Sequence, residues 1–186
     1  MPHRPDDPFA ELASGRFLKL VRRGTWEYAT RTRPCRAAFI GAVTDDGHVL
    51  LTEEYRVPVN AWVVGCPAGL VGDLAGSESE SLEVAVRREL VEEAGYEAAD
   101  VQVMTAGPTS PGMTDEVIAV VVARGLTKVS DGGGVSGEQI RVIPVPLEDV
   151  DGWLRAKERD GRLIDPKVYT VLYFLRCRPP GPGLVE

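Results

Sequence analysis

Runs of apolar residues alternate with short polar turns along most of this chain, and this pattern predicts a mixed α/β fold. The strands expected from it are residues 37–44, 48–56, 61–67, 101–106, 116–123 and 139–145. Asp45-Asp46-Gly47 separates the first two and is typical of a hairpin turn. The run 116–123 is apolar at successive positions, so we expect that strand to be buried on both faces.

Two closing helices are expected after the last of these strands, over residues 147–159 and 165–176. The first begins after a proline, and the second has Asp165 as its expected N-cap and Pro166 at its first helical position. A further helix is indicated by apolar residues that recur every four positions and form one core-facing stripe: Leu82, Val86, Leu90 and Ala94.

The helix with this stripe has capping residues at both ends of the pattern. Ser77 and Ser79 are candidate N-caps, and the acidic residues that follow them suit a helix N-terminus. Gly95 directly follows the last stripe residue and is the expected C-terminal cap.

Length and local composition indicate one main domain with a small addition before it. With 186 residues, the chain can bury a sizeable core, but it is short for two large domains. Strand-like pieces around Gly24 indicate a small antiparallel element. The expected organisation is a flexible tail over 1–15, a small β element over 16–35, the main domain over 36–178 and a flexible tail over 179–186.

Three glutamates are crowded on the helix with the apolar stripe. Glu89 and Glu93 are four residues apart and share one helical face, with Glu92 beside them. Like charges at this spacing destabilise a helix by a few tenths of a kcal/mol per pair. One interpretation is a solvated acidic face, which is the commoner reason for a charge run. The other is a site for a hard divalent cation such as Mg²⁺, which prefers carboxylate and phosphate oxygens.

Charge and cysteine usage narrow the function classes. The net charge is −7, and few aromatic residues lie among the basic ones of residues 16–36, so no nucleic-acid partner is expected. The three cysteines are far apart, which indicates neither a disulfide framework nor a zinc site. No signal peptide or long apolar run occurs, so we expect a cytoplasmic protein without a membrane partner.

The acidic run is similar to a known motif. Glu80, seven residues and then Arg88-Glu89-Leu90-Val91-Glu92-Glu93-Ala94-Gly95-Tyr96 resemble the Nudix box. The box glycine expected six positions before its first glutamate is replaced by Leu74, and Gly69 is the equivalent if residues 71–79 contain a five-residue insertion. Glu78 is an alternative to Glu80 at the first glutamate position.

Segments outside the box resemble one branch of that family, the ADP-ribose and nucleoside-diphosphate-sugar pyrophosphatases. The segments are Ser110–Glu116, Glu53–Arg56, and Trp26–Tyr28 together with Arg31. Pro111 lies at the branch's usual offset beyond the box glycine Gly95, and Glu54 stands where glutamine is usual. The resemblance implies a Nudix α/β/α sandwich with a mixed sheet, and a homodimer built partly by the N-terminal strands.

The resemblance also implies an activity. It is the Mg²⁺-dependent hydrolysis (Mn²⁺ is possible) of the diphosphate linkage of ADP-ribose or a related nucleoside diphosphate sugar, giving a nucleoside monophosphate and a sugar phosphate. Two alternatives are a housecleaning nucleoside triphosphate pyrophosphatase and a non-catalytic sensor of ADP-ribose-type ligands. Intact box acids argue against the sensor, and the segment around Pro111 argues against the triphosphatase.

The metal ligands implied by the resemblance are the Ala68 carbonyl, Glu89, Glu92, Glu93 and Glu138. Arg88 is expected to orient a box carboxylate. Glu138 matches a loop glutamate that serves as ligand or water-activating base, and its alternatives are an exposed loop acid or a box glutamate as base. Gly132-Gly133-Gly134 lacks the Lys-[ST] of a P-loop, so we interpret it as a flexible hinge for the Glu138 loop.

Six residues are candidates for substrate binding: Trp26, Tyr28, Arg31, Arg56, Met113 and Glu116. The arginines can clamp phosphate, with a salt bridge as the alternative. The aromatic rings can stack on a base, with a core or dimer-interface role as the alternative. Glu116 can accept from a ribose or from the catalytic water, and Met113 can line the pocket or simply fill space.

Overall fold

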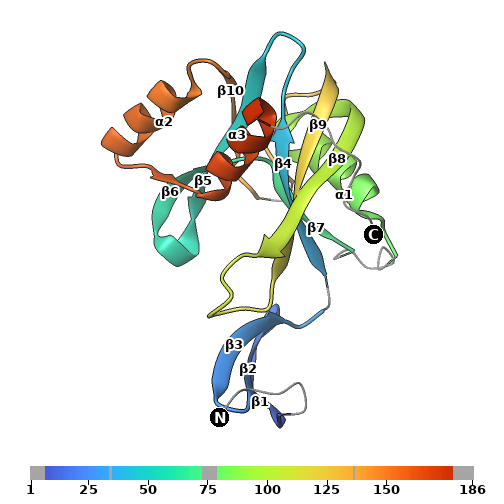
Figure 1. Cartoon of the computed structure of the whole chain (residues 1–186), viewed down its shortest axis with the longest axis vertical. Coiled ribbons are helices and arrows are strands. Elements are labelled where there is room, and N and C mark those ends of the chain that lie inside the picture. Colours follow the sequence, from blue (N-terminus) through green and yellow to red (C-terminus); the bar gives the residue numbers. More distant parts are fainter. Residues whose placement is uncertain (1–6, 34, 73–78, 136, 178–186) are drawn as a thin grey trace.

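The protein has a three-stranded antiparallel N-terminal sheet that projects from a larger body (Figure 1). The structure is a computed structural model that describes residues 7–33, 35–72, 79–135 and 137–177. The strands of the N-terminal sheet are β1 (Phe9–Ser14), β2 (Leu18–Arg23) and β3 (Trp26–Arg31). The predicted small antiparallel β element is therefore present, and its first strand, β1, lies before the predicted range of residues 16–35.

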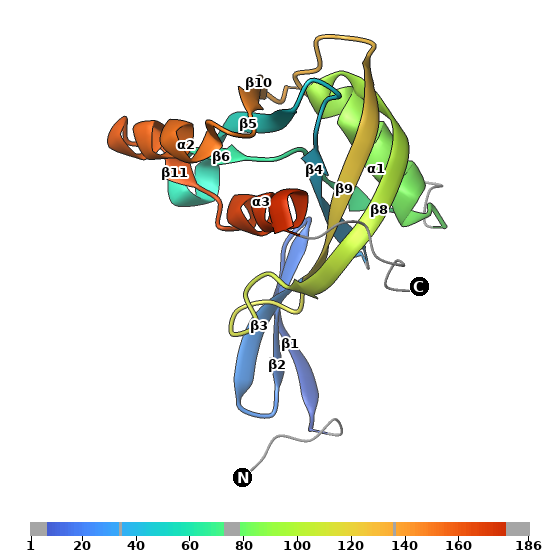
Figure 2. The ribbon, with the colours of Figure 1, turned by 45° about the horizontal axis from the view of Figure 1, so that its top comes forward.

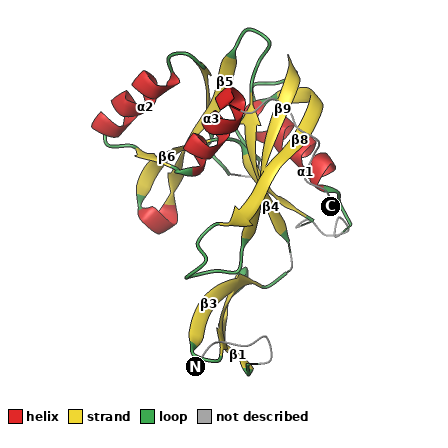
Figure 3. Ribbon diagram, viewed as in Figure 1, coloured by secondary structure: helices red, strands yellow, loops and turns green. Residues whose placement is uncertain are grey.

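The described residues of the body form two four-stranded sheets and three α-helices, coloured by type in Figure 3. One sheet has the order β7-β4-β9-β8, with β7 (Ala68–Val71), β4 (Arg36–Ala42), β9 (Val117–Lys128) and β8 (Tyr96–Pro108). The other has the order β10-β5-β6-β11, with β10 (Arg141–Pro146), β5 (His48–Arg56), β6 (Ala61–Gly65) and β11 (Leu163–Ile164). The helices are α1 (Leu82–Glu89), α2 (Val150–Arg159) and α3 (Lys167–Cys177), with a 3₁₀ turn η1 (Val57–Val59) and a π-helical turn η2 (Leu90–Ala94).

Helices cover the body on two sides, with α3 on one side of β4 and β9 and α1 on the other (Figure 2). Each side has its own apolar core. Leu51 packs in the core beneath α2 and α3, whereas its neighbour Leu50 packs in the core beneath α1. Successive strand residues point to opposite faces, so Glu53 faces α2 and Glu54 faces α1. The mixed α/β/α sandwich predicted from the sequence is confirmed.

Residues 9–14 form a strand, although the sequence analysis placed them in a flexible tail. Strand β1 pairs with β2 in an antiparallel register in which Phe9 lies opposite Arg23. An ion pair of 2.8 Å between Lys19 and Glu11 supports the pairing. The strand was not predicted because the proline-rich composition of residues 1–8 suggested a flexible tail. Residues 1–6 and 178–186 lie outside the described part.

The expected hairpin over 37–56 is only partly correct. The turn is present, since the Gly47 N–H donates to the Thr44 carbonyl at 3.0 Å. The two strands then diverge into different sheets and share one bridge, Val43 with Val49. Strand β4 already pairs with β7 on one edge and with β9 on the other, so no edge remains for β5.

Candidate active site

The box helix begins at Ser81, which corrects the N-caps expected from the sequence. The Ser81 hydroxyl accepts from the Val84 N–H at 3.3 Å, and Ser81 has extended backbone angles typical of an N-cap. Ser79 precedes the cap, and Ser77 lies outside the described residues. The extra residues before the helix therefore do not alter its carboxylate spacing.

The box helix does not continue as a regular α-helix through all of its glutamates. At Leu90 the α-helix gives way to a π-helical turn, which ends at Gly95 with a left-handed φ of +80°. The predicted cap at Gly95 is confirmed. Short π turns are rare and occur frequently at functional sites, and this one contains Glu92 and Glu93.

Glu93 is buried at the centre of the site. Its residue is 9% exposed, and its Oε2 accepts from the Ala68 N–H at 2.8 Å. Burial raises the pKa of Glu93 to about 8. The hydrogen bond from Ala68 opposes this rise in pKa, while the negative charges of Glu89, Glu54 and Glu138 add to it. Acidic side chains of three chain segments therefore act on one buried carboxyl.

Glu89 lies against Gly69, which the sequence analysis identified as the equivalent of the box glycine. A Cβ on Gly69 would lie 2.0 Å from the Cδ of Glu89, far inside van der Waals contact. Only glycine leaves room there for the carboxylate. Strand β7 thus contacts Glu93 through Ala68 and Glu89 through Gly69, which places the Ala68 backbone within the group of predicted ligands.

Arg88 holds the box acids in place from beside the helix. Its guanidinium donates to Glu80 at 3.2 and 3.3 Å, to Glu89 at 2.9 Å and to Glu92 at 3.2 Å. It also donates to the Leu70 carbonyl at 3.2 Å. The hydrogen bonds to Glu80 are the main reason that the pKa of Arg88 lies above its ordinary value.

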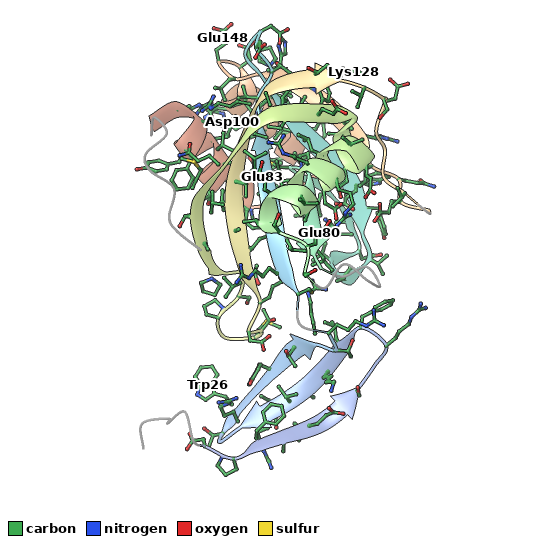
Figure 4. The ribbon with its side chains drawn as sticks, turned by 90° about the vertical axis from the view of Figure 1, so that its right-hand side faces the viewer. Trp26, Glu80, Glu83, Asp100, Lys128 and Glu148 are labelled. Carbon is green, nitrogen blue, oxygen red and sulfur yellow. The ribbon has the colours of Figure 1, made fainter. Side chains whose placement is uncertain are left out.

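Glu80 is the acid that pairs with Arg88 at the start of the box. Its side chain is 8% exposed, and the hydrogen bond from Arg88 lowers its pKa. Its Oε2 also accepts from the Gly72 N–H at 3.3 Å. Figure 4 shows Glu80 at the start of α1. The alternative, Glu78, lies outside the described residues.

Glu138 approaches the site from the segment before β10. Its side chain is exposed, and its Oε2 accepts from the Val135 N–H at 3.0 Å. Its negative charge raises the pKa of both Glu93 and Glu54, although burial is the larger cause for each. Gly133 and Gly134, which precede it, donate their N–H groups to carbonyls of the box helix; the interpretation of the glycine run as a hinge for the Glu138 loop stays a prediction.

Sequence reasoning missed Glu54 as a member of the site. Its side chain is 22% exposed, lies on the face of β5 toward α1 and pairs with Arg56 at 2.5 Å. Burial raises the pKa of Glu54; the charge of Arg56 opposes this rise and that of Glu138 adds to it. The sequence did contain a signal for this residue, because Glu54 stands where the related branch usually has another polar residue, glutamine. Arg56, expected to clamp phosphate, forms the salt bridge that was its alternative.

The donor set suits a hard divalent cation. The carboxylates of Glu54, Glu89, Glu93 and Glu138 are oxygen donors of the kind that Mg²⁺ and Mn²⁺ prefer. Within the described ranges, no three acidic, histidine or cysteine side chains are arranged as a metal site. Each carboxylate is instead held by a protein donor, as Glu93 is by Ala68 and Glu138 by Val135.

Arg31 and Glu116, two predicted substrate-binding residues, form an ion pair with one another. The Arg31 guanidinium donates to Oε1 of Glu116 at 2.6 and 3.1 Å. Both line a cleft of about 900 Å³ between the N-terminal sheet and the start of the box helix, and Glu80 lines it too. The structure therefore brings these two predicted residues together beside one end of the box.

Trp26 and Tyr28 line a separate hollow of about 260 Å³, whose lining includes Pro111 but no box residue. Figure 4 shows Trp26 in the N-terminal sheet, well apart from Glu80. Met113 is 71% exposed, and its carbonyl accepts from the Ala29 N–H at 2.8 Å. Within one chain, these three predicted residues are not beside the box carboxylates.

Known proteins resemble this chain over most of its length. Residues 34–167 match the family model for the NUDIX domain. A methanol dehydrogenase activator of Bacillus methanolicus is 28% identical over 175 residues, covering 90% of each chain. An ADP-ribose pyrophosphatase of Bacillus subtilis is 29% identical over 76% of this chain and 72% of its own. A GDP-mannose pyrophosphatase of Yersinia enterocolitica is 32% identical over 69% and 66%.

The fold has a solved counterpart as well. The crystal structure of an ADP compounds hydrolase superposes with a TM-score of 0.70 and 23% identity, covering 91% of this chain and 90% of that one. None of the helices in the described part of this chain has the length and apolar character that crossing a lipid bilayer requires. The family model, the box geometry and this fold lead to one conclusion: the chain belongs to the Nudix hydrolase family.

Proposed function

We propose that this protein hydrolyses the diphosphate linkage of ADP-ribose or a related nucleoside diphosphate sugar, using Mg²⁺ or Mn²⁺. The observation that carries the proposal is the buried carboxyl of Glu93, which is surrounded by other acids and whose pKa is raised to about 8. A divalent cation would offset that repulsion. Relatives named ADP-ribose pyrophosphatase and GDP-mannose pyrophosphatase support the substrate class.

In this proposal, Glu89, Glu93 and the Ala68 carbonyl would hold the cation, with Glu92 and Glu54 as further oxygen donors. A cation held there would supply neutralisation of diphosphate charge and acidification of water. Arg88 keeps Glu89 and Glu92 oriented through its hydrogen bonds.

Glu138 is the proposed base. Its carboxylate accepts a proton from the attacking water, the water oxygen bonds to one phosphorus, and the bridging P–O bond breaks. The products are a nucleoside monophosphate and a sugar phosphate. The exposed position of Glu138 suits a group that meets water and substrate from the solvent side.

We also propose that the protein forms a homodimer through its N-terminal sheet. Leu18 and Leu20 are 51% and 42% exposed and, being two residues apart on β2, share one face of that sheet; neighbouring exposed apolar side chains of this kind are typical of interaction sites. A second copy would cover them and could bring the ring of Trp26 toward a box that its own chain does not reach. Light scattering should give twice the 20.1 kDa chain mass. Leu20→Lys should shift the population toward monomers, and a monomeric wild type would contradict the proposal.

The activity is tested by incubating the protein with Mg²⁺ or Mn²⁺ and ADP-ribose, ADP-glucose, GDP-mannose, UDP-glucose, NADH or dGTP. The expected result is release of a nucleoside monophosphate from one of the diphosphate sugars. Cleavage of dGTP alone would place the protein among the triphosphate pyrophosphatases. Tight binding of ADP-ribose without turnover would favour a sensor.

Glu93→Gln provides the residue-level test of the proposed metal site. The amide keeps an acceptor for the Ala68 N–H but removes the negative charge, so turnover should fall by about 10²-fold or more while the protein stays folded. The matched control is Glu83→Gln on the exposed face of the same helix, which should keep its turnover. Full activity of Glu93→Gln would contradict the metal assignment.

A further inference from the structure

We propose that Gly132, Gly133 and Gly134 are positioning residues that fix Glu138 beside the carboxylates of the box helix. The inference rests on the proposed function, because it treats Glu138 as the group that accepts a proton from the attacking water. It assigns a role to a glycine run that otherwise resembles only a flexible loop.

The glycine run is hydrogen-bonded to the last turn of the box helix. The Gly133 N–H donates to the Glu93 carbonyl at 2.8 Å, and the Gly134 N–H donates to the Glu92 carbonyl at 3.0 Å. Carbonyls in the last turn of a helix have no partner within the helix, so these bonds satisfy groups that would otherwise need water. The two residues held in this way also carry box carboxylates.

Close packing, and not a need for flexibility, explains why glycine occurs here. A Cβ on Gly132 would lie 2.5 Å from the carbonyl oxygen of Glu93. A Cβ on Gly134 would lie 2.6 Å from Oε2 of Glu138. Both residues have left-handed φ angles, +66° and +85°, which glycine adopts without strain. The run therefore fits closely between the box helix and Glu138.

The same run also contacts the segment that carries Glu138. The Gly133 carbonyl accepts from the Ile140 N–H at 3.2 Å, and Ile140 is buried directly before β10. Val135, the residue after the glycines, donates its N–H to Oε2 of Glu138 at 3.0 Å. Glu138 is thus bonded to Val135 at the end of the glycine run, and two backbone hydrogen bonds hold that run on the box helix.

The first test compares Gly134→Ala with Gly137→Ala. Gly137 lies in the same loop with a φ of +98°, but an added Cβ there would meet no atom within 4 Å. Both changes strain the backbone, and only the first places a Cβ against the side chain of Glu138. Gly134→Ala should lower kcat by about tenfold or more with little change in KM, because small displacements of reacting groups are costly. Gly137→Ala should lose thermal stability but keep kcat within about twofold of wild type.

A double-mutant cycle separates positioning from a general structural effect. In a Glu138→Gln background, Gly134→Ala should cause no further loss of kcat, because the group it displaces has already lost its function. If the kcat of the double variant were lowered by the product of the two single effects, the proposal would be overturned. An equal loss of kcat in Gly137→Ala would also overturn it, since strain alone would then explain the effect.

A measurement without turnover keeps this inference distinct from the proposed function. Mn²⁺ binding, followed by electron paramagnetic resonance, should weaken several-fold in Gly134→Ala and stay unchanged in Gly137→Ala. Amide exchange in residues 130–138 should accelerate in Gly132→Ala, whose added Cβ would clash with the box helix. If the wild-type protein cleaves no substrate but the variants still show these differences, the proposed function is wrong and the positioning role of the glycines is supported. If amide exchange in Gly132→Ala and Mn²⁺ binding in Gly134→Ala both match wild type, the positioning role is wrong.

Discussion

Replacing Glu93 should stabilise the metal-free protein, which is the reverse of what is usual for a buried residue. Burial raises the pKa of Glu93 from 4.5 to about 8 in the folded protein. Between these two pH values, the folded state binds one more proton at this position than the unfolded state. The free energy of unfolding therefore falls as the pH rises through this range. Glu93→Gln cannot ionise and escapes this loss.

The size of the effect follows from the proton difference. One proton corresponds to about 1.4 kcal/mol for each pH unit, so the advantage of Glu93→Gln should grow to an upper limit of roughly 5 kcal/mol near pH 8. Below about pH 4 it should vanish, because the wild-type carboxyl is then neutral in both states. The amide oxygen still accepts the hydrogen bond from Ala68, so the Ala68 N–H keeps its partner.

The assay is urea unfolding of both proteins in the presence of a chelator at pH 5, 6, 7 and 8. Glu83→Gln is the control, because the Glu83 side chain is 60% exposed on the same helix and forms a surface ion pair with Arg87. Its free energy of unfolding should stay within about 0.5 kcal/mol of wild type at each pH. Parallel pH dependences for wild type and Glu93→Gln would refute the reasoning.

Three further predictions follow from the same contacts. Gly69→Ala should lower kcat by about tenfold or more, because the added Cβ occupies the place of the Glu89 carboxylate, and steady-state kinetics would show this. Glu53→Gln should lower the free energy of unfolding by about 3 kcal/mol at pH 7, because it leaves the Lys157 ammonium without its buried partner. The pKa of Glu53 lies below its ordinary value, since its basic partners outweigh burial, so this difference should shrink as the pH falls below about 4.5 in urea melts. Mn²⁺ at a hundred times its Kd should stabilise wild type by about 2.7 kcal/mol in thermal melts, and Glu93→Gln much less.

The box was predictable because all of its information is local. The spacing of Glu89, Glu92 and Glu93 and the cap at Gly95 are properties of one helix, and helix geometry fixes which residues share a face. The pairing of Arg88 with Glu80 spans eight residues and was expected only as a general orienting role. Sequence periodicity therefore predicted the core-facing stripe and the C-terminal cap of this helix, but not the π-helical turn over Leu90–Ala94 that contains Glu92 and Glu93.

The remaining parts of the site depend on pairing between distant segments. Glu54 belongs to the site because β5 leaves the expected hairpin and joins β10, a register that no local pattern reveals. The glycines at 132–134 suggested flexibility by composition, whereas their contacts with the box helix require glycine for close approach. Strand β1 was not predicted because its composition alone does not favour a strand. It is stabilised by pairing with β2.

The acidic site is built at a cost in stability, and its neighbours limit that cost. A buried carboxyl with other acids nearby would by itself favour the unfolded chain. Arg88 offsets the charge of Glu80, Glu89 and Glu92, while backbone N–H groups hold Glu93 and Glu138 without adding any net charge. Negative charge therefore remains where a cation and a diphosphate would meet, and its positions are fixed before either binds. Because burial and neighbouring acids both make the ionised carboxyl of Glu93 unfavourable in the folded state, a cation that binds there would gain from relieving the repulsion as well as from its own ligands. Stability and function should thus respond in opposite directions to the loss of Glu93.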